Sequence, residues 1–200
     1  MYKLTHSLLE SWNRATDPDA SEEQFKDFLV TLERQPRPTT RAMLEGIAFE
    51  SMVNDFARKQ IINIDGMDPR TFAAVHGFGT RLHGACLQVK ADRLVRIGRL
   101  PILLVGVADA LHAGIISDIK RVQRYEYGKY AQSTQHPMYM ELFPEAIRFD
   151  YLIFDGTYCY REQYRRGDYR PIQETAGAFL RYLEDSGLME TYQKHWEVKE

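Results

Sequence analysis

Two short apolar runs, residues 103–109 and 115–120, constrain the fold of this chain more than any other feature. The first run ends in Asp109, and the second reaches Asp118 with Lys120 two residues further on. Because side chains alternate between the two faces of a strand, Asp118 and Lys120 share one face. Buried charges are costly unless they are paired or bind a metal. The pattern therefore predicts two neighbouring strands that bring two carboxylates and an ammonium group together, an arrangement suited to Mg²⁺.

Composition favours one ordinary globular domain over residues 1–200, because 44% of the residues are hydrophobic. The 28 acidic and 26 basic residues give a net charge of −2, so overall charge is no argument for nucleic acid. Cys86 and Cys159 are too few for a disulfide framework or a four-cysteine cluster. The sequence shows neither a signal peptide nor an apolar run of membrane-spanning length. We therefore expect a reduced, cytoplasmic setting and no membrane partner.

Local signals divide the chain into a helical lead-in at 1–38, a core at 39–165 and C-terminal helices at 173–197. Ser21, with a glutamine three residues later, forms a capping box and predicts a helix within the lead-in. The stretch 60–81 contains several glycines and a proline and is a mixed region without a definite element.

The core combines helices and strands. Thr39 or Thr40 is expected to cap a helix that runs to about Lys59. A further helix within 130–143 should have a boundary or a kink at Pro137. Strands are expected at 82–96, 100–108, 115–122, 149–154 and 158–165, the last two joined by an Asp-Gly turn. This order predicts an α/β fold with a mixed central sheet flanked by helices and an N-terminal helical region.

Glu50 interrupts an apolar stripe on the helix that follows Thr40, between Ile47 and Val53. A carboxylate within such a stripe must be neutralised, hydrogen-bonded or metal-bound. The alternative is a glutamate at the edge of the stripe whose head group reaches water. Gly46, one turn earlier, would let another group approach the helix closely. For Asp118 and its lysine the corresponding alternative is a surface ion pair on an edge strand.

Candidate nucleic-acid contacts follow the second apolar run. Gln135 and Tyr139 are four residues apart, so a helix would place them on one face. An amide and a hydroxyl both suit contacts with phosphates or bases. Arg121 and Arg124 belong to a basic segment with interspersed tyrosines that could follow a nucleic-acid strand. The alternatives are a core tyrosine and a solvated charged face.

Other catalytic motifs do not match. Residues 77–80, Gly-Phe-Gly-Thr, lack the third glycine of a dinucleotide-binding loop and the lysine of a P-loop. The six histidines show no zinc-binding spacing, and no serine lies in a nucleophile elbow.

The ordered motifs resemble those of the PD-(D/E)xK nuclease superfamily, in particular its RecB-type branch with phage and CRISPR-associated exonucleases. Asp109 followed by Asp118-Ile119-Lys120 resembles the catalytic core of that family. The segment Gly46 to Glu50 is similar to its upstream helical motif, and Gln135 to Tyr139 is similar to its Gln-x-x-x-Tyr motif. The start Leu4-Thr5-His6-Ser7 also resembles the beginning of such domains.

The resemblance implies a restriction-endonuclease-like core and a metal-dependent deoxyribonuclease, an exonuclease in DNA recombination, repair, or phage or defence processing. It implies that Glu50, Asp109, Asp118 and the carbonyl of Ile119 hold Mg²⁺ or Mn²⁺, ions that prefer oxygen ligands. Lys120 would orient the attacking water, and Glu50, Asp109 and Asp118 would share the catalytic work. Many relatives in that family have histidine where this chain has Glu50. The cysteines that bind an iron–sulfur cluster in some relatives are absent here, so no cluster is expected.

Two other interpretations remain open. The same fold could carry an unused site and serve as a catalytically inactive module that binds nucleic acid or a protein, or the acidic residues could form surface pairs in a purely structural α/β protein. The expected partner is DNA, as linear duplex or single strand, with a homo-oligomer or a helicase or recombination protein as further possibilities. The sequence leaves open DNA or RNA, exonuclease or endonuclease, polarity, oligomeric state and pathway.

Overall fold

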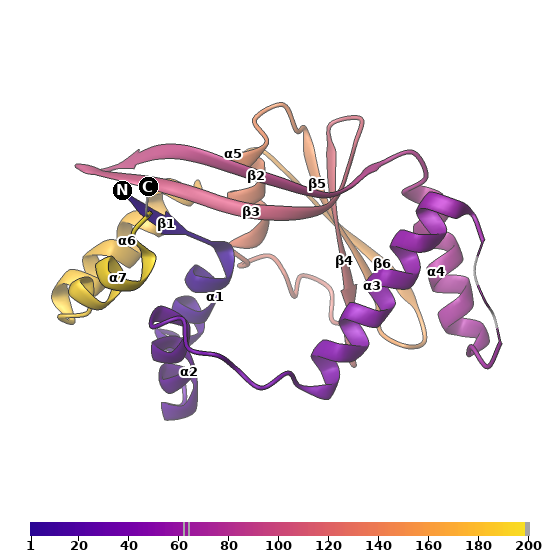
Figure 1. The fold of residues 1–200 in the computed structure, drawn as a ribbon, viewed down its shortest axis with the longest axis horizontal. Helices are drawn as coiled ribbons and strands as arrows, with labels where there is room; N and C mark the ends of the chain where they lie inside the picture. Colours follow the sequence, from indigo (N-terminus) through magenta and orange to yellow (C-terminus); the bar gives the residue numbers. More distant parts are fainter. Residues whose placement is uncertain (62, 64, 199–200) are drawn as a thin grey trace.

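The computed structural model describes residues 1–61, 63 and 65–198. These residues form a mixed six-stranded sheet with helices on both faces, which confirms the α/β fold predicted from the sequence (Figure 1). The strands are β1 (Tyr2–Leu4), β2 (Cys86–Ile97), β3 (Leu100–His112), β4 (Ile115–Arg121), β5 (Arg148–Phe154) and β6 (Cys159–Arg165). The helices are α1 (His6–Ala15), α2 (Glu22–Leu32), α3 (Arg41–Lys59), α4 (Pro69–Arg81), α5 (Gln135–Leu142), α6 (Ile172–Asp185) and α7 (Met189–Trp196).

The long strand β3 organises the sheet. One edge of β3 pairs with antiparallel β2 along nearly its whole length. The other edge pairs with parallel β1 at residues 102–104 and with antiparallel β4 at residues 110–112. Beyond β4 the sheet continues with parallel β5 and antiparallel β6. Residues 105–109 of β3 therefore lie along an edge between two separate partner strands.

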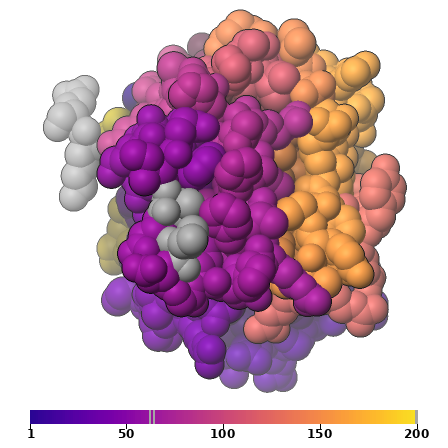
Figure 2. All heavy atoms as spheres, turned by 90° about the vertical axis from the view of Figure 1, so that its right-hand side faces the viewer, coloured from indigo at the N-terminus to yellow at the C-terminus, as the bar shows by residue number. Residues whose placement is uncertain are grey.

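Two apolar clusters lie on opposite faces of the sheet. Along β5, Phe149, Tyr151 and Ile153 belong to the larger cluster, whereas Leu152 and Phe154 belong to the smaller one, as the alternation of side chains requires. The larger cluster packs against α1, α2, α5, α6 and α7, and the smaller one packs under α3 and α4. Figure 2 shows α3 and α4, in purple and magenta, beside the orange β5–β6 hairpin.

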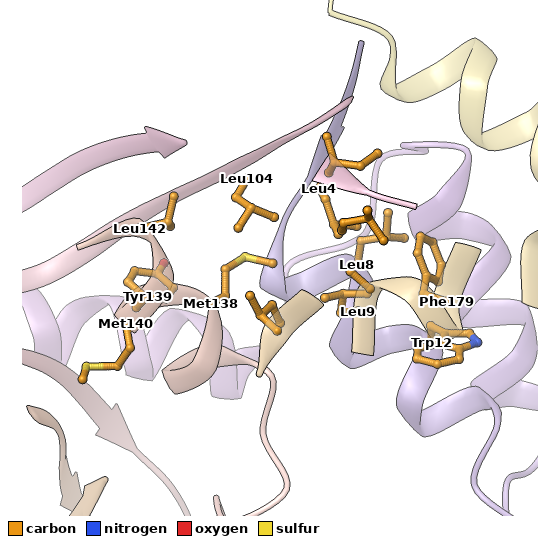
Figure 3. Packing of buried hydrophobic residues seen from close by; sticks show 14 of the residues in the cluster. Leu4, Leu8, Leu9, Trp12, Leu104, Met138, Tyr139, Met140, Leu142 and Phe179 are labelled. Atoms are coloured by element: carbon orange, nitrogen blue, oxygen red, sulfur yellow. The ribbon is translucent and has the colours of Figure 1, made fainter. Parts of the chain in front are cut away.

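The larger cluster ties the beginning of the chain to later elements. Leu4 of β1, Leu8 and Trp12 of α1, Met138 of α5 and Phe179 of α6 all contribute to it (Figure 3). At about 25 cal/mol per Å² of apolar surface removed from water, such burial is the main driving force that holds these distant segments together.

Several local predictions are confirmed. Ser21 and Gln24 form the reciprocal capping box that starts α2, and Thr40 caps α3. The Asp-Gly turn joins β5 to β6, with Gly156 at φ 97°. These features depend on neighbouring residues, which is why a local pattern predicts them.

Two secondary-structure elements, one strand and one helix, were not predicted from the sequence. The lead-in is not purely helical, because β1 joins the sheet beside β3. The mixed stretch contains α4, capped by Asp68 with Pro69 in its first turn. A Cβ on Gly79 would lie 2.5 Å from Cδ1 of Phe56, so this glycine permits close packing of α4 on α3. Glycines that suggest a break in the sequence are here a packing requirement.

Three boundaries also differ from the prediction, the first being the strand expected from residue 82, which begins at Cys86 after the end of α4. The strand expected at 100–108 continues to His112, so Asp109 lies within β3 and not at its end. The helix expected within 130–143 begins at Gln135, with Pro137 in its first turn. A proline is tolerated there because the first N–H groups of a helix have no partner within it.

Candidate metal centre

Asp109 and Asp118 lie where β3 and β4 separate. The strands are joined by a tight turn with Ala113 at φ 49° and Gly114 at φ 74°, the left-handed pair of a type I′ hairpin. Their ladder runs to Ala110 opposite Ser117, and one more step would set Asp109 opposite Asp118. At this point the N–H of Ile119 does not donate to the backbone of β3. It donates to the side chain of Asp109, with 2.8 Å between N and Oδ2. A carboxylate thus occupies the opening between the strands.

Tyr139 fills the adjoining gap along β3. Its hydroxyl donates to the carbonyl of Val107 at 2.8 Å and accepts from the N–H of Val107 at 3.2 Å. A Cβ on Gly106 would lie 2.8 Å from Cδ1 of Leu142 and 3.1 Å from Cζ of Tyr139, so α5 packs tightly against the strand. With only 4% of its surface exposed, Tyr139 acts as a structural partner of β3, and its predicted contact with nucleic acid stays a prediction.

Asp118 and Lys120 form a largely buried ion pair. Nζ of Lys120 lies 2.8 Å from Oδ2 of Asp118, and the Asp118 side chain is 8% exposed. The amide of Gln135 donates to the other oxygen, Oδ1. The shared face predicted from strand alternation is confirmed, and burial rules out the surface ion pair that was the alternative. Gln135 is itself buried, so its observed role is to orient Asp118.

Glu50 lies half-buried on α3 and is close enough to respond to Asp118. Nε2 of Gln88 donates to Oε1 of Glu50 at 2.6 Å, and Asn54 reaches the same oxygen at 3.5 Å. Burial, and next the charge of Asp118, raise the pKa of Glu50, while the hydrogen bond from Gln88 opposes the rise. Glu50 is therefore part of the acidic group and not a fully solvated helix residue.

The carboxylates strongly affect one another. Burial, followed by the charges of Asp118 and Glu50, raises the pKa of Asp109 to about 8, although the hydrogen bond from Ile119 opposes the rise. Burial alone would lower the pKa of Lys120, but the Asp118 carboxylate outweighs it and the pKa is raised. Three acidic groups thus face one ammonium, an imbalance that a divalent cation would relieve.

The residue types fit Mg²⁺ or Mn²⁺. Oδ2 of Asp118 is buried and makes no hydrogen bond of acceptable geometry, despite the nearby Lys120 ammonium. In a strand the N–H and C=O of one residue point to the same side. The Ile119 carbonyl therefore faces the opening that its N–H shares with Asp109. Oxygen ligands of this kind suit both ions.

The side chains are not gathered into a finished cage. Across residues 1–61, 63 and 65–198, no group of three or more His, Cys, Asp or Glu side chains is arranged to hold an ion. Internal donors explain this: Ile119, Gln135 and Gln88 each hold one carboxylate oxygen of Asp109, Asp118 and Glu50. The acidic residues are neighbours whose oxygens would have to turn toward a bound ion.

The predicted basic contacts line a groove against α3, and none of the candidate carboxylates lines it. This groove of about 410 Å³ is lined by Ala42 and Glu45 of α3, by residues 121–124 and by Lys129. Arg121 also lies 5.0 Å from the ring of Phe154, and Arg124 forms an exposed ion pair with Glu126. A larger cavity of about 550 Å³ lies between α1, residues 131–134 and α6, but none of the candidate carboxylates lines it.

Sequence reasoning missed two supporting residues. Glu10 accepts hydrogen bonds from the N–H of Thr134 at 3.2 Å and from its hydroxyl at 3.3 Å, which satisfies the start of α5. Gln88 holds Glu50. Both contacts join segments far apart in the sequence, and no local pattern signals them.

Comparisons with known proteins add a likeness of fold. No family model matches the chain, and no curated protein matches it. A solved structure described as "Crystal structure of SSO0001" superposes with a TM-score of 0.55 at 13% sequence identity. The match covers 91% of this chain and 77% of that one. At this identity the likeness shows the fold alone. No helix in the described part of the chain is both long and apolar enough to cross a membrane.

Proposed function

We propose that this protein is a Mg²⁺- or Mn²⁺-dependent deoxyribonuclease of the PD-(D/E)xK superfamily, in its RecB-type branch, that acts from DNA ends. The observation that carries the proposal is the buried Asp118–Lys120 pair beside Asp109, at the point where β3 and β4 part. Isolated buried charges are costly, so a structural protein has little reason to keep three carboxylates and one lysine together.

The carboxylates would hold the ion. Asp109, Asp118 and the Ile119 carbonyl, with Glu50, would bind Mg²⁺ or Mn²⁺, which supplies acidification of water and neutralisation of phosphate charge when bound. Gln135 keeps Asp118 oriented, and Gln88 keeps Glu50 oriented.

Lys120 would act on the attacking water and on the scissile phosphate. Its pKa is raised by Asp118, so the ammonium stays charged at neutral pH. A fixed ammonium can orient the attacking water and offset the charge that develops on the scissile phosphate. Asp118 lies 2.8 Å from this group, which limits how far the ammonium can move.

The groove beside α3 offers a path for the DNA strand. Arg121, Arg124 and Lys129 line one wall and can meet phosphates. Met43 and Ile47 are more than half exposed on α3 and share its face with Glu50, because they precede it by seven and three residues. Exposed apolar side chains on the face that carries Glu50 suit contacts with the bases of a single strand.

DNA is thus the proposed partner, with a second copy of the chain or a helicase or recombination protein as further partners. Cys86 and Cys159 are free and exposed, which fits the reducing cytoplasmic compartment that we propose for the protein.

The test is incubation of purified protein with end-labelled linear DNA and with circular DNA, in Mg²⁺, Mn²⁺ or EDTA. We expect shortening of linear DNA with either ion, little loss of circles and no reaction in EDTA. Cleavage of circles would assign an endonuclease instead. Binding of DNA without cleavage under all conditions would support the inactive binding module.

A further inference from the structure

Gln88 has an unusual backbone for a strand residue. It lies inside β2 with φ 54°, in the left-handed region that side chains other than glycine rarely adopt. Its neighbours keep one register, Leu87 with Ala110 and Val89 with Ala108, while Gln88 itself is not among the paired residues of the ladder. No residue is inserted into the strand, but its side chains change faces at this point, since Leu87 packs against the smaller cluster and Val89 against the larger one.

The other described non-glycine residues with positive φ have ordinary local reasons. Arg34 follows the end of α2, Gln60 ends α3, and Ala113 lies in the β3–β4 turn. Left-handed residues are common at helix ends and in such turns. Gln88 is also exposed, so burial of its side chain offers no compensation for the strained backbone.

The surroundings of Gln88 supply a reason. The register sets it opposite Asp109, and Nε2 donates to Oε1 of Glu50 at 2.6 Å. Both side-chain donors that reach Glu50 within the described residues, Gln88 and Asn54, use this same oxygen. The other oxygen, Oε2, is left for a different ligand. Strained backbone of this kind is concentrated at functional sites, where the surrounding structure maintains it.

We propose that Gln88 is a positioning residue of the metal centre. Its left-handed backbone directs the amide onto Oε1 of Glu50, so that the carboxylate presents Oε2 toward the ion shared with Asp109 and Asp118. The inference rests on the proposed metal centre, and it adds a residue from the edge strand β2 that the nuclease motifs do not contain. Residues that orient a ligand in this way typically contribute tenfold or more to metal affinity.

Gln88→Gly separates this role from a structural one. Glycine adopts the left-handed conformation without strain but lacks the amide. We expect the unfolding midpoint of the metal-free variant to equal or exceed that of the wild type, while calorimetry shows Mn²⁺ affinity about tenfold lower. Gln88→Ala keeps the strained backbone and also lacks the amide. It should show the same loss of Mn²⁺ affinity, and its unfolding midpoint should be lower than that of Gln88→Gly.

Ala113→Gly is the matched control, because it relieves a left-handed residue in the β3–β4 turn and removes no contact with Glu50. It should leave Mn²⁺ affinity unchanged. Equal Mn²⁺ affinity in wild type and Gln88→Gly, or a lower unfolding midpoint for Gln88→Gly, would overturn the inference. A wild type that binds no Mn²⁺ would instead overturn the proposed metal centre, so the two failures are distinguishable without any cleavage assay.

Discussion

The charge state of Asp109 links the candidate site to the stability of the fold. Its pKa is raised to about 8 by burial and by the nearby carboxylates, from an ordinary value of 3.8. Between these values the folded protein binds a proton that the unfolded chain has released. The stability of the metal-free protein should therefore fall as pH rises from about 4 to about 8.

Asp109→Asn should remove this dependence, because an amide keeps the shape but does not titrate. Urea unfolding of the metal-free protein at successive pH values measures how the free energy of unfolding depends on pH. The wild type should lose at most about 1.4 kcal/mol per pH unit through this group, and the variant should lack that part of the slope. Asp55→Asn, on the exposed surface of α3, is the control and should keep the wild-type slope. An unchanged slope in Asp109→Asn would contradict the assignment.

Glu50→Gln tests the repulsion between neighbouring carboxylates. It removes one negative charge at nearly constant shape, so the metal-free variant should melt at a higher temperature than the wild type. The rise in melting temperature on addition of Mn²⁺ should become smaller, since a ligand of the folded state stabilises it by mass action. Glu45→Gln, on an exposed part of the same helix, should show neither change. If Glu50→Gln melts like the wild type with and without Mn²⁺, Glu50 is not a ligand.

Lys120→Ala tests the catalytic role proposed for the ammonium group. Cleavage of linear DNA should slow about a hundredfold or more, as for loss of a preorganised transition-state contact. Binding of Mn²⁺ should persist, because the carboxylates remain. The variant will also be less stable, since Asp118 keeps a buried charge without its partner. Rates are therefore compared at a temperature where circular dichroism shows both proteins folded, and equal rates would exclude Lys120 from the reaction.

At the level of elements, the packing of α5 on β3 positions the site. Gly106→Ala would place a Cβ 2.8 Å from Leu142 and 3.1 Å from Tyr139. We expect a loss of about 1–3 kcal/mol of stability from overpacking. Cleavage should fall as well, because Gln135 at the start of α5 orients Asp118. Chemical denaturation and the cleavage assay measure the two effects.

Gly77→Ala in α4 is the matched control, because nothing lies within 4 Å of a Cβ there. Alanine is the better helix former by about 1 kcal/mol, so this variant should be slightly more stable and fully active. A Gly106→Ala protein as stable and active as the wild type would show that α5 does not need its close approach to β3.

Elements marked by local chemistry could be predicted from the sequence, and others could not. Caps at Ser21 and Thr40 depend on residues within one turn, and their helices start as expected. Helix α4 depends on the fit of Gly79 against Phe56 from another helix, which no local pattern encodes. In the site, alternation along β4 was enough to pair Asp118 with its lysine, whereas the contact of Gln88 with Glu50 joins a strand to a distant helix.

At the scale of the whole molecule, the two ends of the chain close the larger core. The hydroxyl of Tyr192 donates to the carbonyl of Lys3 at 2.8 Å, and Nε1 of Trp196 donates to the carbonyl of Leu32 at 2.8 Å. Strand β1 is held between β3 and the C-terminal segment, where Tyr2 bridges to Glu197. The C-terminal helices therefore support the same sheet that carries the acidic group, a non-local arrangement that the sequence pattern did not indicate.

The central claim is that one group of residues, positioned by the whole sheet, both holds a divalent ion and cuts DNA. The most direct measurement follows cleavage of end-labelled linear DNA and calorimetric binding of Mn²⁺ in parallel, for the wild type and for Asp118→Ala. We predict that the wild-type cleavage rate rises with Mn²⁺ over the concentrations at which the ion binds, and that Asp118→Ala loses both binding and cleavage. Wild-type affinity for Mn²⁺ in Asp118→Ala, or DNA left intact by the wild type when saturated with Mn²⁺, would contradict the account.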